Sequence, residues 1–259
     1  MGLNILHLAE EWARGLLRDP GQYFAPRQPR QCTVCNYQGR FMTGPGRRER
    51  RCPNCGSRER DRIIGLHMRR TGLAVVGRRV LHLAPEASFY RQWRGTQGYI
   101  AADLARTRTS EQRVDITAID FPDASFDLII CNHVLEHVAD DRRGIAELFR
   151  VLAPGGTAIL SVPIEPDRAE TWTPPADMPK AEVERLCGYG HLRLYGRDFV
   201  DLLRDAGFEA DAVAFTAEEN DRHRLADEIV HVCRKGPSPR LPQLPGFIEQ
   251  GSGFPNVAS

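Results

Sequence analysis

The sequence predicts an α/β fold: a doubly wound, mostly parallel sheet of seven strands, preceded by a small four-cysteine module. Short apolar runs alternate with segments of helical periodicity between residues 63 and 235, the order expected of βαβ units. The run over 126–131 is almost continuously apolar, as a strand buried on both faces should be. Two closely spaced cysteine pairs before residue 56 mark the separate module.

Each expected element has a local signal. A helix over 140–152 is indicated by apolar residues at helical spacing, and it ends at Pro154-Gly155-Gly156. The other elements we expect are helices over 3–17, 60–71, 88–93 and 197–206 and strands over 79–83, 99–102, 157–162, 209–215 and 228–234. The division we expect is an N-terminal helix and connector (1–29), the four-cysteine module (30–62), the α/β domain (63–235) with an insertion over 165–195, and a Pro-rich tail (236–259).

The length fits one full domain with a small accessory module, because 259 residues exceed a typical domain but fall short of two. No segment approaches the ~20 apolar residues that span a bilayer, and the N-terminus lacks the pattern of a secretory signal. We therefore expect a soluble, cytoplasmic protein without a membrane partner. Nothing in the sequence indicates its oligomeric state.

The cysteines predict a structural zinc site. Cys32, Cys35, Cys52 and Cys55 form the pattern C-x2-C-x16-C-x2-C, and each pair lies in a turn-forming context. Two disulfides are the alternative, which the missing secretory signal weakens. Four protein ligands leave no open position on the metal, so it would fold the module instead of taking part in a reaction. The other three cysteines have no ligand spacing and are expected to be buried thiols.

The charge distribution leaves two kinds of partner open. Residues 1–80 hold 16 arginines and 6 acidic residues, a net +10, whereas the remainder holds 19 basic and 28 acidic residues, a net −9. Seven arginines are expected to decorate the four-cysteine module: Arg47, Arg48, Arg50, Arg51, Arg58, Arg60 and Arg62. Such a face can bind nucleic acid, or it can pack on the acidic α/β domain.

The α/β domain resembles the class I, Rossmann-like S-adenosylmethionine-dependent methyltransferases of the type 11-like group. The resemblance rests on the order of four motifs: Leu81-His82-Leu83-Ala84-Pro85-Glu86, Asp103, Asp115-Ile116, and the stretch FPDASFDLIICNHVLEHV from Phe121. It implies S-adenosylmethionine as the cofactor, with Asp103 holding the ribose hydroxyls and Asp115 the adenine amino group. The implied cofactor-binding residues are His82, Ala84, Pro85, Glu86, Asp103, Leu104, Asp115, Ile116, Asn132 and His133.

One loop departs from that family. Glycines normally follow the first strand and let the backbone approach the cofactor, but this chain has Ala84 and Pro85 there, and proline also lacks an N–H. Alanine is the smallest replacement for glycine. The departure favours a variant of the cofactor site and leaves open a protein that has lost cofactor binding.

A histidine cluster follows the central strand. His133, Glu136 and His137 are spaced to share one face of a helix, and we expect His133, His137 and the distant His191 to be catalytic, as a base or as groups that orient the acceptor. The spacing also resembles the cation site of ubiquinone-type and small-RNA methyltransferases. That resemblance implies a second metal site at Glu136, His137 and His191 for magnesium or another divalent cation. Packing against the sheet is the alternative role of these side chains.

The acceptor is the least determined part of the prediction. In this family, an insertion such as 165–195 often forms a substrate lid, which implies that Arg193 and Tyr195 face the acceptor. We expect O-methylation of a small molecule or a sugar or glycan hydroxyl. An RNA acceptor is the alternative, because some ribosomal RNA methyltransferases carry a similar cysteine module, although few aromatic residues are present here for base stacking. A non-catalytic interaction protein is the third.

Overall fold

The computed structural model describes residues 13, 16–17, 28–44, 47–213, 215–225 and 229–236, with only the backbone at 44, 47 and 48. The expected helix over 3–17 and the connector therefore lie almost entirely outside the described residues. The tail beyond residue 236 lies outside them as well.

The α/β domain is built on a seven-stranded sheet, as predicted. The strand order is β10-β11-β9-β8-β5-β6-β7, and every strand is parallel to the central β8 except β11, which is antiparallel to both of its neighbours. The strands are β5 (Val80–Leu83), β6 (Tyr99–Asp103), β7 (Gln112–Arg113), β8 (Phe126–Asn132), β9 (Leu152–Ser161), β10 (Glu209–Val213) and β11 (Val230–Arg234). The mostly parallel, doubly wound fold class is confirmed.

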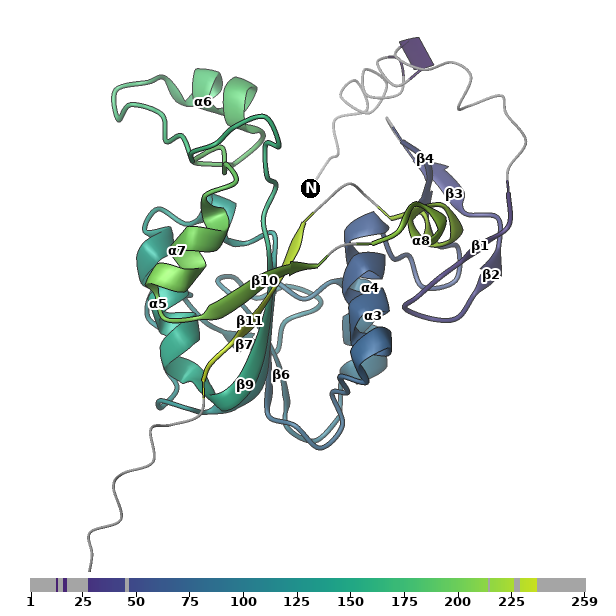
Figure 1. Ribbon diagram of the computed structural model, residues 1–259, viewed down its shortest axis with the longest axis horizontal. Coiled ribbons are helices and arrows are strands. Elements are labelled where there is room, and N and C mark those ends of the chain that lie inside the picture. The colour runs from purple at the N-terminus through teal and green to yellow at the C-terminus, as the bar shows by residue number, and fades with distance from the viewer. Residues whose placement is uncertain are drawn as a thin grey trace, which may run out of the picture.

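Helices cover both faces of the sheet (Figure 1). α3 (Glu59–Thr71) and α4 (Ala87–Trp93) lie on one face, and α5 (Asp141–Val151) and α7 (Phe199–Asp205) lie on the other. Two apolar clusters fill the layers, because alternate residues of each strand point to opposite faces. Leu81 and Ile129 join the cluster under α5 and α7, whereas Val80 and Leu128 join the cluster under α3 and α4.

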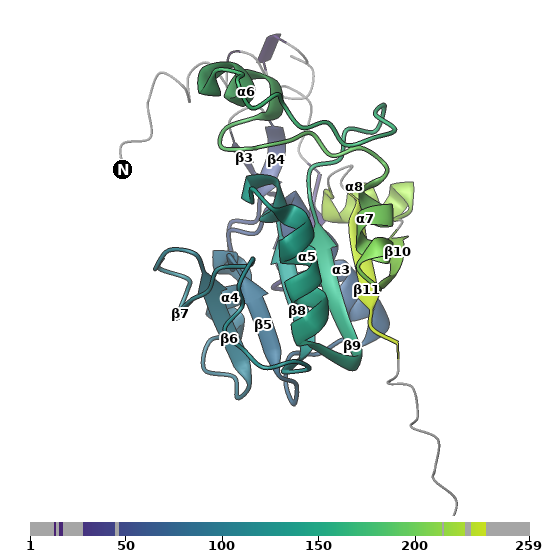
Figure 2. The same cartoon turned by 90° about the vertical axis from the view of Figure 1, so that its left-hand side faces the viewer.

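The strand order creates one crevice at the carboxyl edge of the sheet. β5 and β8 are neighbours in the sheet. The chain continues from β5 to β6 on one side and from β8 to β9 on the other, so it leaves the two strands in opposite directions. Ligands in open α/β sheets bind at this switch point, outside the carboxyl ends of the strands. Above this edge the insertion carries α6 (Lys180–Cys187), which stands away from the sheet in Figures 1 and 2.

The four-cysteine module packs directly on the α3 face. Its strands are β1 (Arg30–Gln31), β2 (Gln38–Gly39), β3 (Met42–Gly44) and β4 (Arg47–Arg51), which form two hairpins. Cys32, Cys52 and Cys55 belong to the same apolar cluster as Ile63 and Phe89. Helix α3 begins at Glu59, so it crosses the boundary expected between residues 62 and 63. The module and the sheet thus share one core.

The arginines of this module are not all on the surface, which corrects the prediction for Arg62. The Arg62 side chain is fully buried and donates to four backbone carbonyls, two of them in or next to α8 (Ala217–His223). Arg50 and Arg60 form ion pairs with Glu59 and Asp61. Arg62 therefore joins the module to α8, whereas Arg50 and Arg60 pair with acidic residues at the start of α3.

The strand that follows α5 begins earlier than predicted. Leu152 already pairs with Phe126, and the register then shifts so that Leu128 faces Thr157. The turn at Pro154-Gly155-Gly156 lies within this irregular part of β9, and Gly155 has φ 75°.

No helix among the described residues has the length and apolar character needed to cross a membrane.

Candidate functional site

A cavity of about 540 Å³ opens at the carboxyl ends of β5, β6 and β8. Six of the predicted cofactor-binding residues line it: Ala84, Asp103, Leu104, Asp115, Ile116 and His133. The volume lies in the range typical of small-molecule sites. The topology therefore brings together residues that are up to 49 positions apart in the sequence, from Ala84 to His133.

The other four predicted residues are not in the lining. His82, Glu86 and Asn132 form a chain of hydrogen bonds beneath the loop: His82 Nε2 lies 3.0 Å from Glu86 Oε2, and Asn132 donates to Glu86 Oε1. His82 Nδ1 also lies 2.9 Å from the Tyr99 hydroxyl. Burial raises the pKa of Glu86, but the bonds to His82 and Asn132 outweigh it and lower the pKa overall. These contacts indicate that His82, Glu86 and Asn132 support the loop from below. Direct contact of these three residues and of Pro85 with a cofactor stays a prediction.

Two residues of the lining have left-handed backbone conformations. Ala84 has φ 46° and His133 has φ 56°, and they follow the adjacent parallel strands β5 and β8. A left-handed conformation costs a non-glycine residue about 1–2 kcal/mol, so the surrounding structure must hold it. Such outliers cluster at functional sites.

The polar part of the lining is acidic. Asp103, Asp115 and Asp140 line the cavity, and no lysine or arginine does so among the described residues. The Asp103 carboxylate makes no hydrogen bond or ion pair within the described part of the chain, so it is available to a ligand. The backbone N–H of Thr117, followed by its hydroxyl, lowers the pKa of Asp115. That Asp140 and Thr117 line the cavity was not predicted from the sequence. The one signal available was the start of the expected helix at Asp140.

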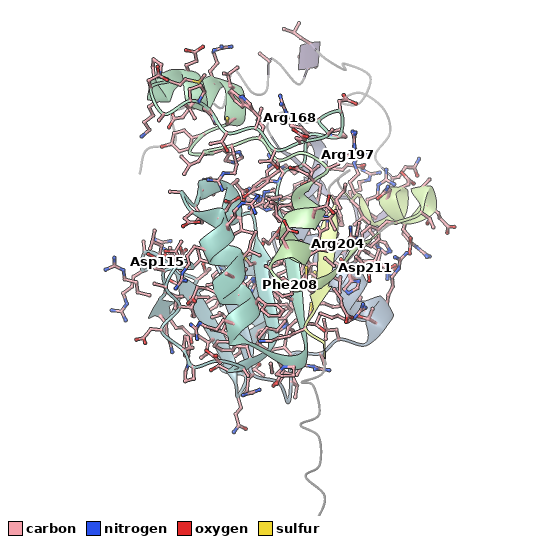
Figure 3. The ribbon with its side chains drawn as sticks, turned by 60° about the vertical axis from the view of Figure 1, so that its left-hand side comes forward. Asp115, Arg168, Arg197, Arg204, Phe208 and Asp211 are labelled. Atoms are coloured by element: carbon pink, nitrogen blue, oxygen red, sulfur yellow. The ribbon has the colours of Figure 1, made fainter. Side chains whose placement is uncertain are left out.

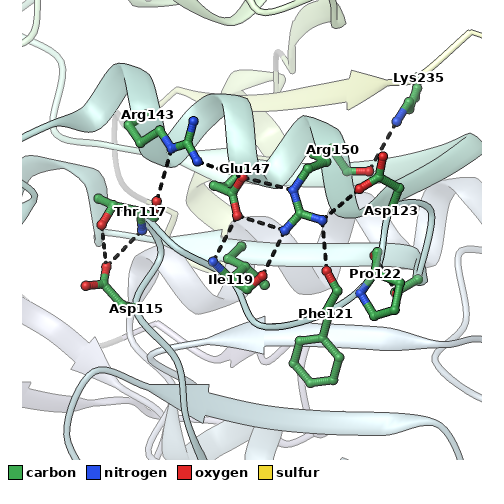
Figure 4. Close-up of polar contacts among 11 residues, drawn as sticks. Asp115, Thr117, Ile119, Phe121, Pro122, Asp123, Arg143, Glu147, Arg150 and Lys235 are labelled. Atoms are coloured by element: carbon green, nitrogen blue, oxygen red, sulfur yellow. Dashed lines mark hydrogen bonds and ion pairs between the residues drawn. The ribbon is translucent and has the colours of Figure 1, made fainter.

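The loop that carries Asp115 is fastened to helix α5 (Figure 4). Arg150 donates to the carbonyls of Ile119 and Phe121 at 2.8 Å and is paired with Glu147, while Glu147 accepts from the Ile119 N–H at 2.9 Å. The hydrogen bond from Arg150 lowers the pKa of Glu147. Figure 3 shows Asp115 at the edge of the molecule opposite Arg204 and Asp211, which lie near β10. Helix α5 therefore positions one wall of the cavity.

The histidine cluster borders the same cavity. His133 and His137 line it, and Glu136, His137 and His191 offer ligand atoms that all lie within 4.8 Å of one another. His137 Nδ1 lies 2.8 Å from the Gly190 carbonyl, so Nδ1 is the donor and Nε2 holds the lone pair in the neutral tautomer. Glu136 is buried; Oε1 lies 3.0 Å from His133 Nδ1, and Oε2 has no hydrogen-bond partner among the described residues. Burial lowers the pKa of His191, which favours its neutral form. The arrangement contains one carboxylate oxygen without a hydrogen-bond partner among the described residues, beside the imidazoles of His137 and His191.

Arg193 and Tyr195 are buried on the far side of this cluster. Arg193 forms an ion pair with Asp141 and donates to the Ala139 carbonyl, and the Tyr195 hydroxyl donates to Asp141 at 2.7 Å. Neither side chain is in the cavity lining. These contacts attach the C-terminal end of the insertion to the start of α5. A contact of either residue with an acceptor stays a prediction.

The four cysteines form a compact cluster. Cys32 Sγ lies 3.7 Å from Cys55 Sγ, Cys35 Sγ lies 3.6 Å from Cys52 Sγ, and all four sulfurs are within 4.8 Å of one another. None is in a disulfide. A tetrahedral zinc ion with bonds of about 2.3 Å would hold its sulfurs about 3.8 Å apart. The cluster fits a closed zinc site with four thiolate ligands.

Residues 91–160 match the family described as "Methyltransferase domain", a span from the end of α4 to the end of β9. This part of the chain is therefore similar to a methyltransferase domain, and it lies within a sheet of Rossmann-like architecture. The four-cysteine cluster lies N-terminal to it.

Two curated relatives illustrate the similarity. The chain is 33% identical over 118 residues to a probable S-adenosylmethionine-dependent methyltransferase of Mycolicibacterium smegmatis, covering 44% of this chain and 42% of that protein. It is 37% identical over 65 residues to the demethylmenaquinone methyltransferase of Deinococcus radiodurans, covering 22% and 27%. The match thus spans less than half the length of these relatives. A crystal structure of a putative methyltransferase from Bacillus halodurans overlaps 66% of this chain and 98% of that one, with 17% identity and a TM-score of 0.45.

Proposed function

We propose that this protein transfers a methyl group from S-adenosylmethionine to a hydroxyl of a small molecule or glycan. The observation that carries the proposal is the cavity with three aspartates and, among the described residues, no cationic lining. S-adenosylmethionine has a sulfonium and an ammonium group, which carboxylates suit. A dinucleotide would instead place a pyrophosphate here, which calls for glycine-rich N–H groups or cations. Asp103 is proposed to accept from the ribose hydroxyls and Asp115 from the adenine amino group.

The first test is calorimetric titration of S-adenosylhomocysteine into the metal-loaded protein and into Asp103→Ala. The wild type is expected to bind in the micromolar range. The variant should lose at least about 2 kcal/mol, roughly 30-fold, because hydrogen bonds to a charged acceptor contribute about 1.5–3 kcal/mol each. Asp205→Ala is the matched control, since Asp205 is exposed at the end of α7 and lies outside the cavity. A folded wild-type protein that does not bind would overturn the enzyme proposal and favour a non-catalytic interaction protein.

The proposed reaction needs proximity and the removal of one proton. S-adenosylmethionine supplies a methyl group on a sulfonium, which is already a good electrophile. The acceptor oxygen forms the new O–C bond as the C–S bond breaks, and the hydroxyl proton must leave. His137 is proposed to accept this proton where no ion occupies the second metal site, because it lines the cavity and its Nδ1 is bonded to the Gly190 carbonyl, which leaves Nε2 as the accepting atom. His133 lines the cavity beside it, and His191 meets His137 from the insertion.

The second metal site remains part of the proposal, and its donors favour a particular class of ion. Two imidazoles and one carboxylate suit zinc or another transition metal, whereas magnesium prefers oxygen ligands. Glu136 Oε2 is buried, and no hydrogen-bond partner for it lies in the part of the chain that the structure describes; such an atom is costly unless a ligand or water satisfies it. The bond from His137 Nδ1 to the Gly190 carbonyl is the outer contact that metal-binding histidines usually make. A bound ion would lower the pKa of an acceptor hydroxyl and orient it.

Metal analysis after gel filtration tests this site. The wild type is expected to retain two equivalents of zinc per chain, and Glu136→Gln to retain one, because the amide cannot supply the anionic ligand. Glu182→Gln, an exposed change on α6, should behave as the wild type. One equivalent in both the wild type and Glu136→Gln would remove the second metal and leave the histidines as direct bases.

RNA is the second candidate acceptor, favoured by the basic front of the chain, where Arg40 and Arg51 are exposed. Against it, Arg62 is buried, and Arg30 is paired with Glu49 inside the module. A salt-dependent affinity for RNA with a steep slope would support this candidate over a small acceptor.

The cytoplasmic location of the protein also stays a prediction.

A further inference from the structure

We propose that the zinc ribbon, residues 30–57, holds the cofactor loop, residues 84–86, in place through helix α4, so that metal binding and cofactor binding strengthen one another. The proposal rests on the function proposed above. The evidence is a set of contacts made by residues 87–94, the eight residues after the loop, which link the four-cysteine cluster to the cavity.

The cofactor loop needs external support. Ala84 lines the cavity in a left-handed conformation, where glycine is the usual residue. Pro85 cannot donate a backbone hydrogen bond. On its inner side the loop is fixed to the sheet, because Asn132 of β8 donates to Glu86 and His82 of β5 lies 3.0 Å from it.

On its outer side the loop is fixed by two polar contacts from α4, one to the start of α3 directly after the ribbon and one to the ribbon itself. Ser88 Oγ donates to Asp61 Oδ2 at 2.8 Å, and both side chains are buried. The same carboxylate oxygen accepts from the Arg58 N–H at 3.1 Å, so it also caps α3 immediately after the second cysteine pair. One turn further along α4, Arg91 donates to the backbone carbonyl of Cys55.

Apolar packing joins the same elements. Phe89 and Trp93 of α4 stack with their ring centroids 4.5 Å apart. Phe89 belongs to the cluster that contains Cys32, Cys52 and Cys55, and Trp93 packs against it. The inner face of α4 therefore packs into the cluster that the ribbon cysteines share with the sheet, while the residue two positions before the N-cap of the helix lines the cavity.

Metal binding sets the geometry of the segment that α4 contacts. Cys52 N–H donates to the Ser57 carbonyl at 3.0 Å, and Gly56 N–H donates to the Cys52 carbonyl at 2.9 Å, so residues 52–57 form one tight turn around two ligands. Loss of the metal would release the Cys55 carbonyl and the start of α3 together. Because coupling between two binding sites is reciprocal, the cofactor must strengthen metal binding by the same factor.

The test compares Ser88→Ala/Arg91→Ala with Arg94→Ala, a matched loss of an exposed arginine at the end of α4. All proteins are loaded with zinc, and zinc content is verified. S-adenosylhomocysteine affinity is measured by calorimetry, and the rate of zinc capture by a chromogenic chelator is measured with and without S-adenosylhomocysteine. If the double variant fails to fold, Arg91→Ala alone replaces it.

In the wild type and in Arg94→Ala, S-adenosylhomocysteine is expected to slow zinc capture at least about fivefold, the lower end of typical coupling. The double variant should keep its zinc, bind S-adenosylhomocysteine at least about fivefold more weakly, and lose the slowing. Equal affinity and equal slowing in the double variant and Arg94→Ala would overturn the coupling.

A wild type that does not bind S-adenosylhomocysteine would overturn the proposed function, and amide hydrogen exchange then decides the structural part separately. Faster exchange over residues 84–90 in the double variant than in Arg94→Ala would support the contact between ribbon and loop. Equal exchange would overturn it.

Discussion

Replacement of Cys52 by serine is expected to lower the melting temperature by more than about 10 °C and to destabilise the whole α3 face of the domain. Structural zinc contributes about 10–16 kcal/mol to folding in zinc-finger peptides at neutral pH, and a serine ligand gives up most of it. Cys52 is buried in the same cluster as Ile63 and Phe89, so the loss is transmitted to the sheet. Thermal unfolding followed by circular dichroism, with zinc analysis of each sample, measures the effect.

Cys187→Ser is the control for this experiment, because Cys187 is a buried thiol of α6 outside the four-cysteine cluster. It should keep its zinc and show a much smaller shift. If Cys52→Ser unfolded in two steps, with the larger step unchanged, the ribbon would be an independent module and the shared core would carry little energy. A retained zinc ion would contradict the assignment of Cys52 as a ligand.

The sheet could be predicted because its strands leave a strong signal in the sequence. The parallel strand β8 is buried on both faces, so six consecutive residues before Asn132 are nearly all apolar. Such a run, followed by polar residues and an amphipathic helix, has few alternative interpretations. The short strand β7 and the helix α8 were not predicted. Gln112–Arg113 is only two polar residues long, and Ala217–His223 is polar and contacts β1, which is distant in the sequence.

The cavity could be predicted in part, for the same topological reason. Asp103 was predicted from its position at the end of the second expected strand and Asp115 from its resemblance to the family motif, and both line the cavity. The sequence offered no way to separate residues in the lining from residues beneath it. His82 and Glu86 flank Ala84 and Pro85 in one short motif, yet their side chains turn toward Tyr99 and Asn132. Only the packing of four strands decides which of them a ligand can reach.

Arg62→Met is the second substitution with a large expected effect. The guanidinium donates to the carbonyls of His223, Arg224, Ser57 and Arg50 at 2.6–3.1 Å, and it lies 4.7 Å from the centre of the Phe41 ring. Methionine fills a similar volume but leaves four buried carbonyls without this donor. We expect a loss of about 3–5 kcal/mol, measured by urea unfolding, because an unpaired buried polar group costs its full desolvation energy.

Arg51→Met is the matched control, since Arg51 is exposed at the end of β4 and its loss should change the free energy of unfolding by less than about 0.5 kcal/mol. Equal stability of the two variants would mean that the four carbonyls find water instead. Sequence reasoning grouped Arg62 with its charged neighbours, because a run of arginines gives no sign that one of them is internal. What makes Arg62 internal is its position on α3, facing both the ribbon and the end of α8, so a surface charge pattern conceals the residue that joins three parts of the fold.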